Sequence, residues 1–253
     1  GYEFALLCEV HITLDGGETI CVASNATDWQ ARRSTILDSS IFNGETRDDT
    51  MDTTAVYGVK PAGLGLERLE ARRTPPTRVM LKIKPKELIV TPNGDYVLDM
   101  GQNMVGWLAF ENRLPKGAEV LFQFGEVLQG GEFYRDNLRT ALCEYRYRSD
   151  GEAKQVRQRF TFYGFRFVKI TGWPGVPDLN DFEGLVLYSD MTQTGQITTG
   201  NEKVNRLFEN ALWGQRGNFL DVPTDCPQRD ERMGWTWDAQ VFFGTAAFNM
   251  DVY

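Results

Sequence analysis

The stretch TTGNEKVNRLFENALWGQRGN (198–218) marks the point at which the hydrophobic period of this chain changes. Its apolar residues recur at the spacing of one helical face: Val204, Leu207, Phe208, Ala211 and Leu212. Asn201 precedes them as a candidate N-cap, and Glu202 adds a carboxylate to the first turn, where the helix dipole favours negative charge. The stretch therefore predicts an amphipathic helix.

Before this stretch, from residue 4 to about 170, short alternating segments are separated by turn residues. In AEVLFQF (118–124), Val120, Phe122 and Phe124 fall on one face, which predicts a strand that is buried on that side. The aromatic phase slips by one residue near Gly164, which predicts a bulge there. A long series of short strands and turns is typical of β-sandwiches.

The chain divides into three predicted domains. Arg72 to Thr77 contains two prolines and no periodicity, and it predicts an interdomain linker. Residues 1–77 are expected to form part of an N-terminal β-sandwich domain, 78–195 a second β-sandwich domain, and 196–253 the start of a helical domain. A second helix is predicted after the first, and because its apolar residues nearly encircle it, it needs neighbours on several sides.

This second helix runs from about Trp235 to Phe248, close to the last residue. We therefore expect the helical domain to be cut short and to continue beyond residue 253. The strand-like opening GYEFALLCEV suggests that the chain also begins within a domain. The predicted fold is mostly β and multidomain, with two sandwiches followed by the first helices of a larger helical domain.

Composition excludes several classes of function. The 253 residues carry a net charge of −8, which argues against a nucleic-acid partner, because such binding needs a clustered positive face. No run of about 18 apolar residues is present, so no membrane-spanning helix is predicted. We expect a soluble protein, cytoplasmic, periplasmic or secreted. No pattern specifies its oligomeric state.

Histidine and cysteine usage narrows the chemistry further. The single histidine, His11, nearly excludes Ser-His catalysis and multi-histidine metal sites. The four cysteines lack the close spacing of a zinc or redox motif: Cys8, Cys21, Cys143 and Cys226. Gly16-Gly17 predicts a two-residue hairpin tip that sets Cys21 opposite Ile12. Cys8 then lies about 13 Å further along the strand, so a disulfide between them is not expected.

The segment DVPTDCPQRDERMGWTWD (221–238) is the richest in chemistry. It contains five carboxylates: Asp221, Asp225, Asp230, Glu231 and Asp238. One interpretation is a solvated loop between helices, with Asp and Pro as turn formers. The other is an active site, in which Trp235 and Trp237 hold the loop near an apolar wall and shift carboxylate pKa values apart. Arg229 and Arg232 would pair with some of the acids, and indole beside carboxylates suits a sugar ligand.

The run DCPQRDERMGWTWDAQ (225–240), with NFLDVPTD before it, closely resembles bacterial α-L-rhamnosidases of glycoside hydrolase family 78. The resemblance extends through five upstream motifs: DMGQNMVGW (99–107), FGEVL (124–128), DNLRTA (136–141), FTFYGFRFVKITG (160–172) and GNEKVNRLFENALWGQRGN (200–218). NGETRDD (43–49) resembles the family's N-terminal domain. The family's architecture implies two β-sandwich domains followed by the opening of an (α/α)6 barrel that carries the catalytic site.

The resemblance also implies a mechanism. Family members hydrolyse terminal α-L-rhamnosides with inversion, using one protonated carboxyl as general acid and one carboxylate that activates water. Matched position by position, Glu231 would be the general acid, and Asp230 is its rival for that role. The general base would lie beyond this chain, so the 253-residue piece alone is expected to be inactive.

The same match assigns the residues that would hold the sugar. Asp225 and Asp238 would accept hydrogen bonds from rhamnose hydroxyls, Arg229 would bind a hydroxyl or orient a carboxylate, and Trp235 would line the pocket. Trp237 departs from the family, which more often has glycine there, and this affects fine specificity. The expected partner is a rhamnose-containing glycan or glycoside, with no metal and no cofactor.

Two alternatives remain open at this point. The chain could be a carbohydrate-binding or scaffolding module, in which Trp107 and Trp173 would be either glycan platforms or plain core residues. It could also belong to a glycosidase with the same helical barrel that acts on another sugar.

Overall fold

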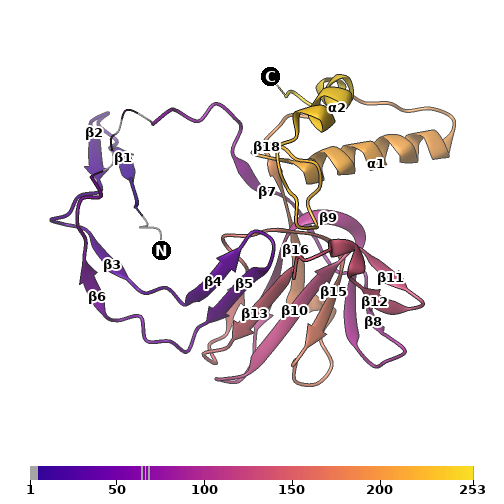
Figure 1. The fold of residues 1–253 in the computed structure, drawn as a ribbon, viewed down its shortest axis with the longest axis horizontal. Helices are drawn as coiled ribbons and strands as arrows, with labels where there is room; N and C mark the ends of the chain where they lie inside the picture. The colour runs from indigo at the N-terminus through magenta and orange to yellow at the C-terminus, as the bar shows by residue number, and fades with distance from the viewer. Residues whose placement is uncertain (1–4, 64, 66, 68, 253) are drawn as a thin grey trace. The chain divides into compact units, whose positions relative to one another are not determined.

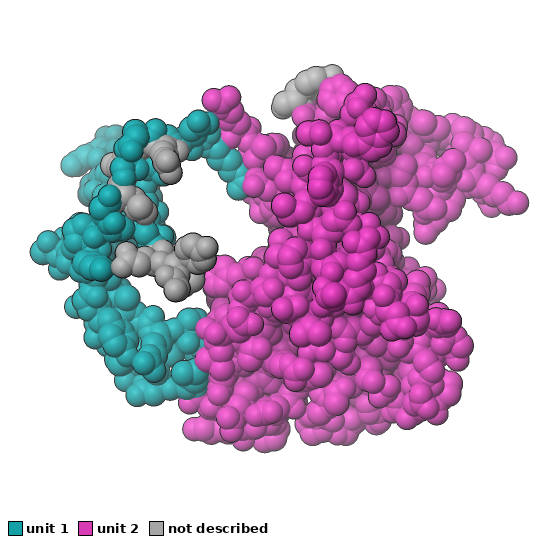
Figure 2. Space-filling model, viewed as in Figure 1, with its two compact units in different colours: residues 1–35, 51–72 teal, residues 36–50, 73–253 magenta. Residues whose placement is uncertain are grey.

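The computed structural model describes residues 5–63, 65, 67 and 69–252. The chain forms two compact units, which Figure 2 colours separately. Unit 1 comprises residues 1–35 and 51–72, and unit 2 comprises residues 36–50 and 73–253. The chain passes between the units three times, and the third crossing, after residue 72, falls within the predicted linker.

Unit 1 contains two separate two-stranded sheets. In one, β1 (Glu9–Thr13) pairs antiparallel with β2 (Thr19–Ala23), and in the other, β3 (Gln30–Arg32) pairs antiparallel with β6 (Val56–Gly58). None of the described residues of this unit is buried. Its strands are therefore held by backbone hydrogen bonds, and an isolated pair of strands has little stability of its own.

The β1–β2 hairpin differs by one residue from the predicted register. Leu14 and Glu18 still pair through the Leu14 amide, so the loop has three residues, and Gly17 takes a φ of +83°. A three-residue loop with a left-handed third residue is a common alternative to the two-residue turn. As a result Cys21 lies opposite His11, and the predicted partner Ile12 pairs with Ile20.

Unit 2 is built around a ten-stranded sheet that folds over itself (Figure 1). Its strands are β4 (Ile36–Ser40), β5 (Gly44–Asp48), β7 (Thr77–Ile83), β8 (Glu87–Val90), β9 (Tyr96–Asn112), β10 (Glu119–Gly125), β13 (Glu144–Arg148), β14 (Lys154–Val156), β15 (Tyr163–Thr171) and β16 (Phe182–Ser189). They follow the order β4-β5-β13-β10-β15-β9-β16-β7, with β8 and β14 added to β9. Only the β5–β13 pair is parallel among these ladders.

The long strand β9 closes the sandwich. Its first half pairs with β8 and β15, and its second half pairs with β14 and β16. A shift between Asp99 and Met104 lets extra residues bulge out of the ladder. Gly106 pairs with both β15 and β16. Its φ is +154°, and a Cβ there would lie 1.9 Å from the Leu185 carbonyl oxygen. Only glycine fits this close approach of two backbones.

The core of unit 2 follows the predicted alternation. Val120, Phe122 and Phe124 are all buried, as the pattern in 118–124 predicts. Trp173 packs, partly buried, against the large aromatic core, and Trp107 packs against a smaller apolar cluster. Both tryptophans therefore have a structural role in the sandwich.

The predicted bulge at Gly164 is wrong. Gly164 lies in regular pairing opposite Val105, and the irregularity occurs further along, between Phe165 and Phe167, where β9 carries the extra residues. Gly164 is required for a different reason, because a Cβ there would lie 2.9 Å from the Cβ of Gln228. The glycine makes room for the segment that follows the first helix.

Both predicted helices are present. Helix α1 (Glu202–Asn218) begins at Asn201, whose side chain accepts a hydrogen bond from the Lys203 amide at 3.0 Å. Helix α2 (Thr236–Asn249) is joined to α1 by a buried hydrogen bond from Asn249 to Gln215, of 2.9 Å. Helix α1 packs on β9 and β16, at one end of the sandwich (Figure 1). The mostly β fold with two C-terminal helices is confirmed.

Helix α2 exposes apolar side chains, as its sequence predicts. Trp237 and Val241 are each 72% exposed, and Phe243 and Phe248 are about half exposed. In the part of the chain that is described, neither helix has the length and hydropathy needed to cross a membrane.

The remaining elements are short. They are the hairpin of β11 (Val127–Gln129) and β12 (Glu132–Tyr134), the 3-10 helices η2 (Asp136–Leu138) and η3 (Leu179–Asp181), and the hairpin of β17 (Phe219–Leu220) and β18 (Val222–Pro223).

Candidate active site

The segment that joins α1 to α2 forms a closed loop against the end of the sandwich. The Asp225 amide donates to the Met233 carbonyl oxygen at 3.1 Å, and the Met233 amide donates to Asp225 Oδ1 at 2.9 Å. We call residues 225–233 the acid loop. The two hydrogen bonds join its ends, so the residues between them form a compact unit.

Left-handed backbone is concentrated around the acid loop. Among the described residues, four other than glycine have φ between +45° and +72°: Arg139, Cys143, Asp221 and Arg232. Each such residue costs on the order of 1 kcal/mol or more, and it persists only where its surroundings fix it. Strain gathered in one region of a protein is common at functional sites.

Arg232 is the most buried residue of the acid loop, with 5% of its surface exposed. Its guanidinium donates to five acceptors: the carbonyl oxygens of Ile41, Phe162, Gln228 and Arg229, and Cys143 Sγ. Burial lowers the pKa of this guanidinium, and the Cys143 thiol partly offsets that effect. No carboxylate is among these partners, so the prediction that Arg232 pairs with the acids is wrong.

Glu231 extends away from Arg232 and meets two other arginines. Its Oε2 atom lies 3.0 Å from Arg229 Nη2 and 3.2 Å from Arg139 Nη1. The Glu231 side chain is 28% exposed, and both arginine side chains are more exposed than that. These contacts are ion pairs at the surface of the loop, where solvent and a ligand can compete for them.

Asp230 has a different environment from its neighbour Glu231. Its Oδ2 accepts from the Thr140 hydroxyl and amide, and its Oδ1 lies 3.8 Å from Arg139 Nη1. The hydrogen bond from the Thr140 hydroxyl holds the pKa of Asp230 below its usual range, with help from Arg139. Asp230 is therefore an ionised structural contact between the acid loop and the segment that follows η2.

Asp225 is the second ionised carboxylate of the loop. Burial alone would raise its pKa, but hydrogen bonds from the Cys226 thiol and from the Met233 amide outweigh burial and lower it. Its buried Oδ2 has no hydrogen-bond partner within the described residues. That oxygen is a buried acceptor that the hydrogen bonds of the loop leave unpaired.

Asp225, Cys226 and Glu231 each offer one atom within 4.8 Å of the others, a spacing that could suit a metal ion. Arg229, however, donates to Cys226 Sγ at 3.2 Å and also pairs with Glu231. A guanidinium cation already bridges the sulfur and the carboxylate, so this arrangement fits a metal ion poorly.

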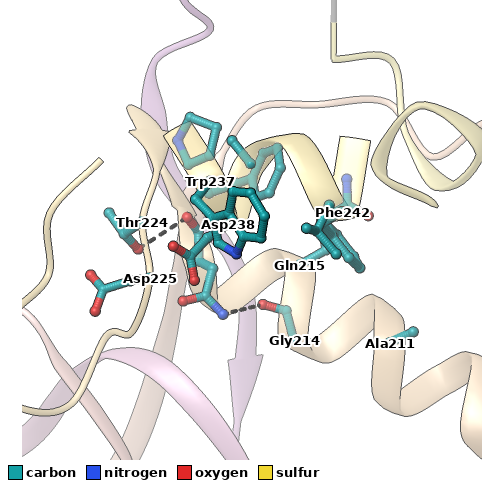
Figure 3. Close-up of a pocket in the computed structure, with 13 residues that line it drawn as sticks. Ala211, Gly214, Gln215, Thr224, Asp225, Trp237, Asp238 and Phe242 are labelled. Atoms are coloured by element: carbon teal, nitrogen blue, oxygen red, sulfur yellow. Dashed lines mark hydrogen bonds between the residues drawn. The ribbon is translucent and has the colours of Figure 1, made fainter. Parts of the chain in front are cut away.

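A cleft of about 390 Å³ lies between α1, the first half of α2, the β17–β18 hairpin and Asp225, the first residue of the acid loop. Figure 3 shows Asp225 and Thr224 on one side of it, Asp238 and Trp237 from α2 on another, and Gln215 from α1. A cleft of this volume with an indole, apolar walls and a few polar groups is in the range of small-molecule sites.

The predicted site residues thus fall into two groups. Asp225 and Asp238 line the cleft together. Glu231 and Arg229 form an ion pair with each other. A carboxylate oxygen of Asp225 lies within 4.8 Å of one of Glu231, so Asp225 belongs to both groups. Trp235 precedes α2 and is half exposed, outside the residues that line the cleft.

Three residues that contact the acid loop carried no predicted role: Arg139, Thr140 and Cys143. The first two belong to DNLRTA (136–141), a motif of the family resemblance, but the 90 residues between them and the acid loop hide the contact. Cys143 is buried, and burial raises the pKa of its thiol, so it remains a neutral donor and acceptor.

Family models match almost the whole chain in order. The α-L-rhamnosidase N-terminal domain matches residues 1–80, the bacterial α-L-rhamnosidase concanavalin-like domain matches 89–188, and the six-hairpin glycosidase domain of the same enzymes matches 192–253. The chain belongs to the bacterial α-L-rhamnosidase family. The resemblance drawn from the sequence motifs is thereby confirmed.

Individual relatives agree with the family models. An α-L-rhamnosidase of Formosa agariphila is 37% identical over 98% of this chain and 28% of its own length. The native α-L-rhamnosidase of Aspergillus terreus has a TM-score of 0.89 at 35% identity, over 97% of this chain and 30% of that one. The Streptomyces avermitilis α-L-rhamnosidase, solved with L-rhamnose, has a TM-score of 0.88 at 34% identity, over 97% of this chain and 25% of its own. The chain therefore spans roughly a quarter to a third of the length of these α-L-rhamnosidases.

Proposed function

We propose that this chain is part of a longer enzyme that hydrolyses terminal α-L-rhamnosides with inversion of configuration. In this proposal residues 1–77 are part of an N-terminal domain whose residues 36–50 join the ten-stranded sheet, residues 78–195 form most of the β-sandwich, and residues 196–253 open the (α/α)6 barrel. The family membership and the L-rhamnose bound by the Streptomyces avermitilis relative support a rhamnoside over other sugars.

Glu231 is the general acid in this proposal. The observation that carries the assignment is the contrast between the two adjacent acids. Asp230 is held ionised by Thr140, whereas the Glu231 carboxylate pairs with the partly exposed side chains of Arg229 and Arg139. A general acid must donate its proton to the leaving glycosidic oxygen, so it needs a carboxyl that a substrate can reach.

Inversion needs a second carboxylate that activates a water on the opposite face of the sugar, roughly 6.5 to 9.5 Å from the acid. We assign this general base to the part of the enzyme that lies outside the 253 residues. The 253-residue chain alone then has half of the catalytic pair.

The sugar-binding roles follow from the cleft. The carboxylates of Asp225 and Asp238, which both line the cleft, would accept hydrogen bonds from rhamnose hydroxyls. Arg229 and Trp235 do not line the cleft, so their roles rest on the family resemblance: Arg229 would orient Glu231 or donate to a hydroxyl, and Trp235 would cover an apolar edge of the sugar. Trp237 lines the cleft and is largely exposed, so its indole would limit the size of the leaving group.

The test is a panel of 4-nitrophenyl glycosides given to the full-length enzyme. Turnover of the α-L-rhamnoside, with the β-anomer of rhamnose appearing first in the proton NMR spectrum, is the expected result. Turnover of another glycoside in preference to the rhamnoside would contradict the choice of substrate.

A second measurement tests the division of the catalytic pair. The purified 253-residue chain is expected to release no 4-nitrophenol from the α-L-rhamnoside, because it lacks the general base. Release at a rate above that of a Glu231→Gln version of the same chain would contradict this part of the proposal.

A further inference from the structure

The Arg232 guanidinium is fully engaged. An arginine side chain has five N–H donors, and Arg232 makes five hydrogen bonds. Its positive charge is buried without a carboxylate among these partners. A buried charge is costly to desolvate, and here hydrogen bonds to carbonyl oxygens and a thiol offset that cost, so removal of the guanidinium would leave buried acceptors unpaired. Arg232 also imposes a fixed geometry on the segment that it binds.

The acceptors come from four separate parts of the chain, one of which is Cys143, directly before β13. Ile41 follows β4, Phe162 directly precedes β15, and Gln228 and Arg229 belong to the acid loop itself. The rings of Phe42 and Phe162 lie 5.9 and 5.2 Å from the guanidinium carbon. Because the guanidinium is planar and its donors have fixed directions, this set of contacts fixes both the place and the orientation of the loop on the sandwich.

Arg232 follows Glu231 directly in the sequence, and its left-handed φ of +52° turns the chain between the two side chains. Among the described residues, the Glu231 carboxylate forms ion pairs with Arg229 and Arg139, whose side chains are one-third to one-half exposed. Its position therefore depends on the backbone of the acid loop, and the backbone depends on Arg232. A misplacement of about 1 Å in a catalytic group can lower a rate by about 100-fold.

We propose that Arg232 is a positioning residue for the reaction: it ties the acid loop to the β-sandwich and thereby sets the location of the Glu231 carboxylate. This inference rests on the proposed role of Glu231 as general acid. It makes the sandwich part of the apparatus that positions the acid.

The experiment compares two substrates of the full-length enzyme, 2,4-dinitrophenyl α-L-rhamnoside and methyl α-L-rhamnoside. The dinitrophenolate leaves without protonation, whereas methanol needs the general acid. For Arg232→Met, kcat on the methyl rhamnoside is expected to fall by about 100-fold, against less than about 5-fold on the dinitrophenyl rhamnoside. Equal losses on both substrates would overturn the proposal.

Arg166→Met is the matched control. Arg166 makes two hydrogen bonds of 2.8 Å to Asp99 within the sandwich, away from the acid loop. Its loss should weaken the fold, yet it should change kcat on the two substrates by the same factor. A leaving-group dependence like that of Arg232→Met in this control would also contradict the inference.

Phe162→Leu decides the question if Arg232→Met does not fold. It removes one ring from the guanidinium and keeps the Phe162 backbone acceptor. We expect a smaller loss of kcat, again confined to the methyl rhamnoside, and equal losses on both substrates would overturn the proposal. A wild-type enzyme that hydrolyses neither rhamnoside would instead refute the proposed function, and the positioning role with it.

Discussion

Arg229 and Arg232 lie three residues apart in one loop, but their surroundings differ in almost every respect. Arg232 is buried and bound to backbone carbonyl oxygens and a thiol, whereas Arg229 is one-third exposed and paired with the Glu231 carboxylate. The first holds the loop in place, and the second accompanies the group that would react. Within the acid loop, stability and chemistry are thus assigned to separate side chains.

The largest expected effect is a loss of stability when the buried arginine, Arg232, is replaced. Arg232→Met leaves the carbonyl oxygens of Ile41, Phe162 and Gln228 without that donor, so the free energy of unfolding should fall by about 3 kcal/mol or more. Arg229→Met should cost less than about 1 kcal/mol, because its ion pair is partly exposed. Urea denaturation followed by tryptophan fluorescence measures both. Equal losses would mean that the two arginines have similar structural roles.

A smaller effect is expected where the sandwich meets the acid loop. The Cβ of Gly164→Ala would lie 2.9 Å from the Cβ of Gln228, so the loop must shift, at a cost of about 1 to 3 kcal/mol. Gly214→Ala in α1 is the matched control: apart from its chain neighbours and the backbone of its own helix, no atom lies within 4 Å of the new Cβ, and the change should stabilise the chain by about 0.5 to 1 kcal/mol. Thermal melting of the two variants tests the difference in sign. A stabilising Gly164→Ala would show that the loop does not press on the sandwich here.

The smallest expected effect is a difference in pH dependence between Arg232, which has no carboxylate among its hydrogen-bond partners, and Arg166, which pairs with Asp99. Hydrogen bonds from Arg166, together with the Gly101 amide, hold the pKa of Asp99 below its usual range. The Asp99 contribution, about 1.5 kcal/mol, is therefore present above the pKa that Asp99 has in the unfolded chain, and it is lost as pH falls through the folded-state value.

Urea denaturation at pH 7 and at pH 3 checks this prediction. The cost of Asp99→Asn should shrink at pH 3, whereas the cost of Arg232→Met should stay the same, because none of the partners of Arg232 is a carboxylate. A pH-dependent cost for Arg232→Met would point to an acid that contributes to its binding.

Local patterns in the sequence predicted much of the fold. The helical spacing of 201–212 and the Asn201 cap gave α1, and the alternation in 118–124 gave the buried face of β10, because both depend on neighbours in sequence. The same kind of evidence misplaced the bulge at Gly164 and the register of the first hairpin. Those features depend on the approach of Gln228 and on one left-handed residue, Gly17.

The sequence identified most residues of the candidate site but not how they contact one another. The acid loop was recognised from its composition and its family motif, but the parallel pairing of β5 with β13 brings residues 36–50 into unit 2 without any local signal. Arg232 illustrates the consequence. Next to so many carboxylates, its charge suggested ion pairs, and only the fold brings Ile41 and Phe162 within reach.

The most direct test of the central claim is the turnover of a Glu231→Gln variant of the full-length enzyme. Glutamine keeps the shape of the side chain but has no acidic proton, so kcat on methyl α-L-rhamnoside should fall by roughly 100- to 10,000-fold. Binding of L-rhamnose, followed by isothermal titration calorimetry, should persist because Asp225 and Asp238 remain. Turnover within a few-fold of wild type would contradict the assignment of Glu231 as the general acid.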